Sequence, residues 1–117
     1  MPTSSAPRPG RPVRGSDSGK PVMALLDLLG RRWVLRLVWE LGEGPWTFRA
    51  LQAACGGVSS SVLSQRLGDL RDAGAVELVD DGYALTGEGR ELLAIYPPLD
   101  AWAARWAARA TPRRTRP

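Results

Sequence analysis

The fold is decided by residues 47–74, which read TFRALQAACGGVSSSVLSQRLGDLRDAG. Apolar side chains fall on one face of residues 48–54, so we predict a short helix there. The pair Gly56-Gly57 follows and predicts a tight turn. Residues 59–73 are predicted to form a longer helix, because apolar residues recur there with helical spacing and Gly74 is suited to end it. Two helices joined by a short glycine turn are typical of a helix-turn-helix.

Both helices begin at residue types that cap a helix N-terminus. Thr47 stands before the first helix and Ser59 before the second. A hydroxyl at such a position accepts a hydrogen bond from a backbone N–H that has no partner within the helix. The apolar stripe of the second helix consists of Leu63, Leu67 and Leu70, which we expect to face the core.

The opposite face of this second helix is small and polar. It carries Ser61, Ser64, Gln65, Gly68 and Asp72. A glutamine amide can pair with adenine, a serine hydroxyl can bond to a base or a phosphate, and a helix N-terminus favours phosphate. Asp69 and Asp72 lie in the C-terminal half, so only the N-terminal half is suited to contact DNA. The alternative is that a serine run followed by Gln65 is an ordinary solvated helix start.

After Gly74 the apolar period changes from helical to alternating. The alternating residues, on both sides of Asp80-Asp81-Gly82, are Val76, Leu78, Tyr83 and Leu85. This pattern predicts a β-hairpin with a tight turn. The fold class is therefore mainly α with a small β-hairpin, a winged helix-turn-helix. In such a module the second helix of the pair enters the major groove of DNA.

Two further helices are predicted upstream of this unit. Pro21 is suited to the first turn of a helix over residues 22–29, and Gly30 is expected to end it in the left-handed conformation. A second helix is predicted from Trp33 to about residue 41. Trp46 is expected to be extended, because it lies between the turn residues that stop this helix and the next helix cap.

The C-terminal helical segment carries more apolar surface than one small domain can cover. Pro97-Pro98 predicts a kink or a break near Tyr96. We expect the segment beyond this break and the helix over 22–29 to pack against a second copy of the chain. The expected interface residues are Val22, Leu25, Leu29, Leu99, Trp102 and Trp106. The alternative is that both tryptophans fold back onto their own domain.

Length and cysteine content define the class of protein. A chain of 117 residues has room for one domain, and a single cysteine, Cys55, excludes an internal disulfide and indicates a reducing compartment. No apolar run approaches the roughly 20 residues that span a bilayer, and no apolar segment typical of a secretory signal follows the basic N-terminus. The expectation is a cytoplasmic protein without a membrane partner.

The net charge of +4 is unevenly distributed. Residues 1–20 contribute +3 and residues 111–117 another +3, whereas residues 21–110 carry nine arginines and eleven acidic residues. We therefore predict a disordered basic arm over 1–19, a folded domain over 20–110 and a disordered basic tail over 111–117. The arm and tail either track DNA phosphates or serve as solubilising ends.

Several segments, in the same order, make the chain similar to the HxlR-type winged-helix regulators. They are residues 20–33, 44–51, 58–74 and 83–90, which include GRRW at 30–33 and LSQRL at 63–67. The resemblance implies a homodimer that binds an inverted-repeat operator and usually represses, but sometimes activates, transcription. By position, the residues it places against DNA are Thr47, Arg49, Ser59, Ser60, Ser61, Ser64, Gln65 and Arg66. Arg66 either reaches a phosphate or pairs with an acid within the fold.

Three departures from that family are visible. Lys20 stands where members often carry a cysteine, which some of them use to sense oxidants or electrophiles, and Cys55 is expected to be a small buried residue rather than a redox group. Basic residues that members often carry are replaced by Ser61 and Gly68. The predicted wing is short, and its acidic tip would repel a phosphate backbone.

The sequence gives no indication of an enzyme. It has no histidine, no cluster of metal-ligand residues and no phosphate-cradling loop, so no cofactor or metal is expected. The main rival to DNA binding is a winged-helix protein-interaction module, which the acidic wing and the slightly negative body favour. A small-molecule effector is a further option, in a pocket lined by Trp33, Trp102 and Trp106, although no polar residue marks such a site.

Overall fold

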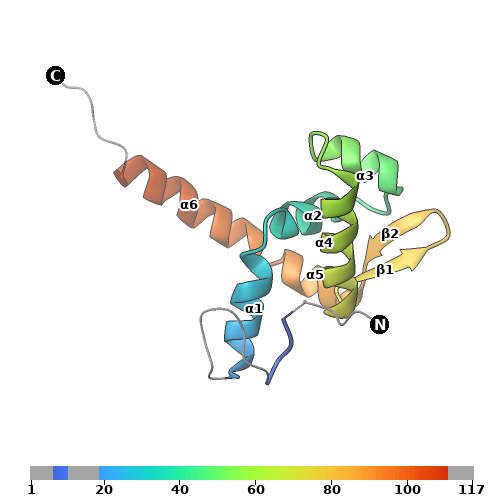
Figure 1. Ribbon diagram of the computed structural model, residues 1–117. Helices are drawn as coiled ribbons and strands as arrows, with labels where there is room; N and C mark the ends of the chain where they lie inside the picture. The colour runs from blue at the N-terminus through green and yellow to red at the C-terminus, as the bar shows by residue number, and fades with distance from the viewer. Residues whose placement is uncertain (1–6, 11–18, 111–117) are drawn as a thin grey trace.

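In the computed structural model, helices form where the sequence supplies helical spacing and a cap, and strands form where the period is two. The structure describes residues 7–10 and 19–110, so the predicted arm and tail lie largely outside it. The elements are α1 (Pro21–Leu29), α2 (Val34–Leu41), α3 (Phe48–Ala54), α4 (Ser60–Asp72), β1 (Val76–Val79), β2 (Gly82–Leu85), α5 (Gly87–Leu93) and α6 (Tyr96–Ala110) (Figure 1). The predicted winged helix-turn-helix is confirmed.

The N-terminal ends of α3, α4 and α5 are fixed by hydroxyl caps. The Thr47 side chain accepts a hydrogen bond from the Ala50 backbone N–H at 3.1 Å, and the Ser59 side chain accepts one from Val62 at 3.2 Å. Thr86 caps α5 in the same way. Both caps predicted for the helix-turn-helix are therefore confirmed, and they fix where α3 and α4 begin.

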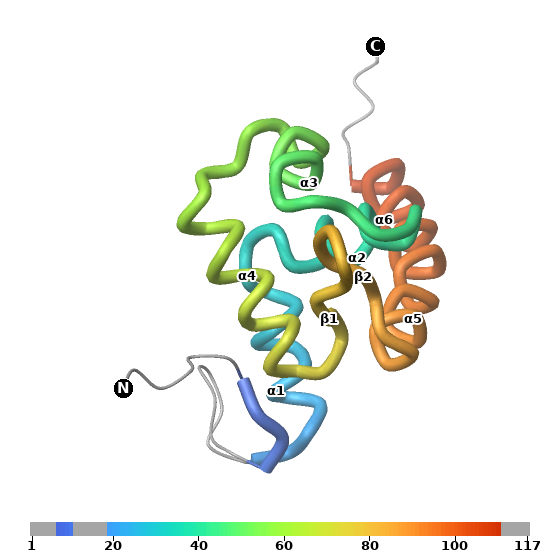
Figure 2. Tube along the Cα trace, turned by 90° about the vertical axis from the view of Figure 1, so that its right-hand side faces the viewer, coloured from blue at the N-terminus to red at the C-terminus, as the bar shows by residue number. Residues whose placement is uncertain are grey.

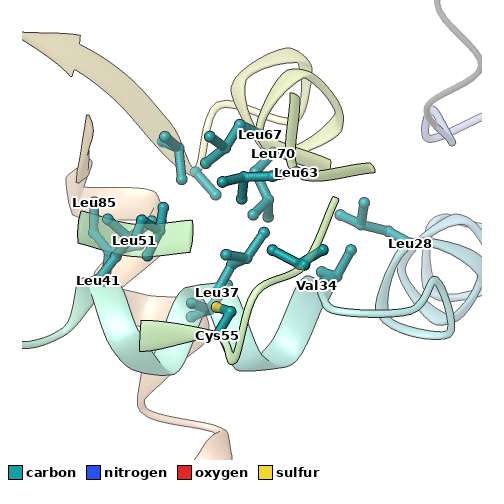
Figure 3. Close-up of a cluster of buried hydrophobic side chains, with 14 residues drawn as sticks. Leu28, Val34, Leu37, Leu41, Leu51, Cys55, Leu63, Leu67, Leu70 and Leu85 are labelled. Atoms are coloured by element: carbon teal, nitrogen blue, oxygen red, sulfur yellow. The ribbon is translucent and has the colours of Figure 1, made fainter. Parts of the chain in front are cut away.

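The core is built around α2, whose inner face meets the leucine stripe of α4. Leu63, Leu67 and Leu70 are buried, as the helical spacing predicted. Figure 3 shows them pointing toward Leu37 and Val34 of α2. Burial of these side chains is the main force that holds α4 on the body of the domain.

The hairpin, β1 and β2, is a two-stranded antiparallel sheet that packs on the connection between α2 and α3. Val79 pairs with Gly82, so the turn consists of Asp80 and Asp81 alone. Trp46 forms the predicted extended segment, because its backbone N–H and C=O both bond to Tyr83, at 3.0 and 2.9 Å. Gly82 lies so close to the Trp46 backbone that a side chain there would overlap it.

The end of α1 differs from the expectation. Gly30 is right-handed, with φ −77°, whereas the following turn places Trp33 in the left-handed region with φ 80°. The Gly30 N–H continues the helical bonding to the Leu26 carbonyl, and the Arg31 N–H bonds to the Leu28 carbonyl. The reversal therefore occurs at Trp33, and α2 begins at Val34 rather than one residue earlier.

Helix α6 extends away from the rest of the domain (Figure 1), and the break predicted near Tyr96 separates it from α5. None of its residues is buried, and its base is held by the Tyr96 ring, whose centroid lies 4.7 Å from that of Trp39. Trp102 and Trp106 are 50% and 54% exposed, so they do not fold back onto their own domain.

The tryptophans of α6 do not form the expected effector pocket. Trp102 and Trp106 stack on each other with a centroid distance of 6.1 Å. Because both rings are about half exposed, they do not line an enclosed cavity with Trp33.

None of the helices described by the structure has the length and apolar character needed to cross a bilayer.

Candidate nucleic-acid interface

The turn between α3 and α4 consists of two glycines in the left-handed region. Gly56 has φ 75° and Gly57 has φ 84°, a conformation that residues with a Cβ seldom adopt. The Gly57 N–H bonds back to the Gln52 carbonyl at 3.0 Å, which closes the turn. The glycine pair therefore allows the short connection over residues 55–59 between α3 and α4, and the polar N-terminal half of α4 lies at the surface (Figure 2).

Gln52 is a positioning residue that the sequence analysis missed. Its side-chain Nε2 donates to the Val58 carbonyl at 2.8 Å and to the Ser60 hydroxyl at 3.3 Å. It thus connects α3 to the residues immediately before and at the start of α4. The sequence of this seven-residue helix does not indicate the role of Gln52, because both of its partners lie beyond the glycine turn.

Seven of the eight residues predicted to meet DNA have exposed side chains. They are Thr47, Arg49, Ser59, Ser60, Ser61, Ser64 and Gln65. The last five are brought together on the first turns of α4, and the other two lie at the start of α3. The Ser59 hydroxyl is already the helix cap, so its backbone and the following N–H groups are the parts that remain for a ligand.

Arg66 pairs with an acidic residue within the fold, which is one of the two roles expected for it. Its Nη1 lies 2.9 Å from the Asp69 carboxylate, and its Nε donates to the Arg32 carbonyl at 3.1 Å. The guanidinium is therefore directed toward the connection between α1 and α2. In this arrangement it is not extended from α4 as a free phosphate contact.

The wing places negative charge beside the start of α3. Asp80 and Asp81 form the exposed tip, and together with Thr47 and Trp46 they line an open depression of about 700 Å³. Two carboxylates there would repel a phosphate near Thr47. The tip would therefore repel the DNA backbone, whereas the start of α4 is polar and carries no acidic residue in its first turn.

No group of three or more metal-ligating side chains comes together among the residues that the structure describes.

Cys55 is 2% exposed and packs in the apolar core. Burial raises the pKa of its thiol, which keeps it protonated and unreactive at neutral pH. Lys20, in contrast, is exposed at the start of α1.

We expect Cys55 in the folded chain to react with a thiol reagent about tenfold or more slowly than in the unfolded chain. The free energy of unfolding should also fall as pH rises through the ordinary thiol range, because the folded state retains a proton that the unfolded state loses. Lys20→Cys combined with Cys55→Ser is the control, since its exposed thiol should react rapidly. Rapid labelling of Cys55 under native conditions would contradict its burial.

Comparison with known proteins agrees with this geometry. A family model described as HxlR-like helix-turn-helix matches residues 28–111. The HTH-type transcriptional regulator YvaP of Bacillus subtilis is 34% identical over 88 residues, which cover 69% of this chain and 82% of YvaP.

Two solved structures share the fold. A possible HxlR family transcriptional factor from Thermoplasma volcanium has a TM-score of 0.67 at 30% identity, and the match covers 76% of this chain and 86% of that one. Quinone-bound YodB from B. subtilis has a TM-score of 0.69 at 30% identity, covering 72% of this chain and 96% of YodB.

Proposed function

Because the chain belongs to the HxlR-like helix-turn-helix family of transcriptional regulators, we propose that it binds duplex DNA as a homodimer and represses transcription from inverted-repeat operators. The observation that carries this proposal is the exposed N-terminal half of α4. Its exposed side chains are polar, and the first backbone N–H groups of a helix have no carbonyl partner within the helix and favour a phosphate.

The source of affinity follows from the charges. Residues 21–110 carry nine arginines and eleven acidic residues, so the body as a whole does not attract DNA. Arg49 is exposed at the start of α3 and is the basic side chain best placed to bind a phosphate beside the reading helix. The basic segments at the two ends of the chain, which lie outside the described residues, would add sequence-independent attraction.

Gln65 is proposed as the direct reader. A glutamine amide can make two hydrogen bonds to adenine in the major groove, a contact that discriminates by about 1–3 kcal/mol. We expect Gln65→Ala to lose the preference for one base in each half-site selected from a random DNA pool, with other positions unchanged. Asp72→Ala, on the same exposed face but in the C-terminal half, should leave every base preference intact.

The same selection distinguishes the rival function. The acidic wing tip favours a winged-helix module that binds another protein. If the unaltered chain enriches no DNA sequence at low salt, this rival replaces the proposal. If Gln65→Ala weakens binding to all sequences equally, DNA binding stands but direct reading by Gln65 does not.

An effector, if one acts, would have to work differently from a reagent that modifies an exposed thiol. YodB has been solved with a quinone bound. In this chain the single cysteine is buried in the core. We therefore propose that any small-molecule effector binds without forming a bond to sulfur. The Cys55→Ser variant should then respond to the effector, in its DNA binding, as the unaltered chain does.

A further inference from the structure

A partly buried ionic cluster joins the reading helix to the helix that begins the domain. We define this ionic cluster as Asp27, Arg31, Arg66 and Asp69. Asp69, on the inner side of α4, is 5% exposed, and its carboxylate pairs with Arg66 at 2.9 Å and with Arg31 at 3.3 Å. Arg31 also pairs with Asp27 of α1 at 3.3 Å. The cluster therefore runs from α1, through the connection before α2, to the C-terminal half of α4.

A second contact strengthens this connection. The Nε of Arg66 donates to the Arg32 backbone carbonyl at 3.1 Å, while its Nη1 holds Asp69. The Arg66 side chain thus spans two points, its own helix and the backbone of the α1–α2 connection. Rotation of α4 about its axis, or a slide along it, would lengthen at least one of these contacts.

The chemistry of the cluster is better suited to fixing an orientation than to adding stability. A buried ion pair often contributes no more to stability than apolar residues of similar volume, because desolvation offsets the attraction. The leucine stripe already holds α4 on the core, but apolar contact has no preferred direction. Arginine–carboxylate contacts are directional, since the guanidinium presents its N–H groups in a fixed plane.

Because α1 belongs to the expected dimer interface, the orientation of α4 relative to α1 affects how the dimer meets DNA. Val22 of α1 is 54% exposed, and Val22 belongs to the expected dimer interface. In a symmetric dimer, the distance between the two reading helices depends on how each is oriented relative to the interface. A contact that fixes α4 against α1 therefore bears on the half-site spacing that the dimer accepts.

We propose that the ionic cluster, with Asp69 as its central positioning residue, sets the orientation of α4 relative to α1 and thereby the spacing of operator half-sites. The proposal rests on the proposed function, because it requires a dimer that binds two half-sites. It assigns Asp69 no contact with DNA. It also explains why Arg66, although it lies on the reading helix, points toward the α1–α2 connection.

The test measures binding to duplexes that carry two selected half-sites separated by spacers increasing one base pair at a time. Asp27→Ala removes the ion pair between Asp27 of α1 and Arg31 and leaves both Asp69 pairs in place. We expect it to reduce the preference for the best spacer over its neighbours by about tenfold, or about 1.4 kcal/mol. Binding to a single half-site should be unchanged. Asp27→Glu, which retains the carboxylate, should recover part of the preference.

Two further variants complete the design. Asp69→Asn should lose the spacing preference as well, and where a thermal melt shows that this variant does not fold, Asp27→Ala decides the question. Asp72→Ala removes an exposed carboxylate from α4 outside the cluster and should behave like the unaltered chain.

The outcomes distinguish failure of the role of the ionic cluster from failure of the proposed function. If the unaltered chain has a spacing optimum and folded Asp27→Ala retains all of it, the role of the cluster is overturned and the proposed function stands. If the unaltered chain binds no paired half-sites at any spacing, the proposed function fails and this inference fails with it.

Discussion

Replacing Gly89 with alanine is expected to lower the free energy of unfolding by about 3 kcal/mol. Gly89 is a buried residue in the first turns of α5, where the helix crosses the turn between α4 and β1. A Cβ at this position would overlap the Ala75 carbonyl oxygen and would also lie 3.0 Å from a methyl group of Leu85. The overlap outweighs the gain of about 1 kcal/mol that alanine normally gives a helix over glycine.

The Ala75 carbonyl cannot move away without a further loss. It accepts the Thr86 backbone N–H at 3.0 Å, and the Thr86 hydroxyl in turn caps α5 through the Gly89 N–H at 3.1 Å. Relief of the overlap would therefore open the bond that joins the strand region to the start of α5. Because the same contact supports β1 and β2, the whole wing should loosen.

Gly87→Ala is the matched control for this effect. Gly87 is in the same helix, but a Cβ there would meet no atom within 4 Å, so stability should be unchanged or slightly raised. Urea unfolding followed by tryptophan fluorescence measures both variants against the unaltered chain. Equal midpoints for Gly89→Ala and Gly87→Ala would show that the close approach at Ala75 is absent in solution.

The features that were predictable from sequence are those with local causes. Thr47 and Ser59 cap their helices through backbone N–H groups three residues away, and the stripe of α4 follows from the helical period alone. The hairpin turn at Asp80-Asp81 is likewise determined by the alternation on its two sides. In each case the causal residues lie within one or two turns of the chain.

The features that the sequence did not reveal depend on residues far apart in the chain. Asp69 was expected only to lie outside the groove, and its burial depends on Arg31, 38 residues earlier. The tight packing of Gly89 depends on the path of the chain at Ala75. The left-handed Trp33 depends on how α1 and α2 meet, since local preference favours glycine in that conformation.

Substituting glutamate for both Trp102 and Trp106 is expected to convert a dimer into a monomer at micromolar concentration. These residues and Leu99 make one face of α6, and all three are large apolar side chains that the domain leaves about half exposed. Helix α6 extends from the body of the domain (Figure 1), and none of its residues is buried by its own chain. A second copy of the chain is the partner that two-fold symmetry would supply.

The magnitude follows from the area available. The four tryptophan rings of two chains, each about half exposed, could remove about 400 Å² from water, worth about 10 kcal/mol before the costs of association. Carboxylates at both positions replace this gain with the cost of burying charge. Dimerisation should therefore be abolished rather than weakened, and sedimentation velocity measures the change directly.

Loss of the dimer should carry over to DNA. Two linked readers gain about a hundredfold or more in affinity over one, so the double variant should bind a paired operator little better than a single half-site. Ala104→Glu places the same charge on the opposite face of α6 and should retain both the dimer and its affinity. If the unaltered chain sediments as a monomer at micromolar concentration, the apolar face of α6 has another partner. The ionic cluster could then not set a half-site spacing, because that role requires a symmetric dimer.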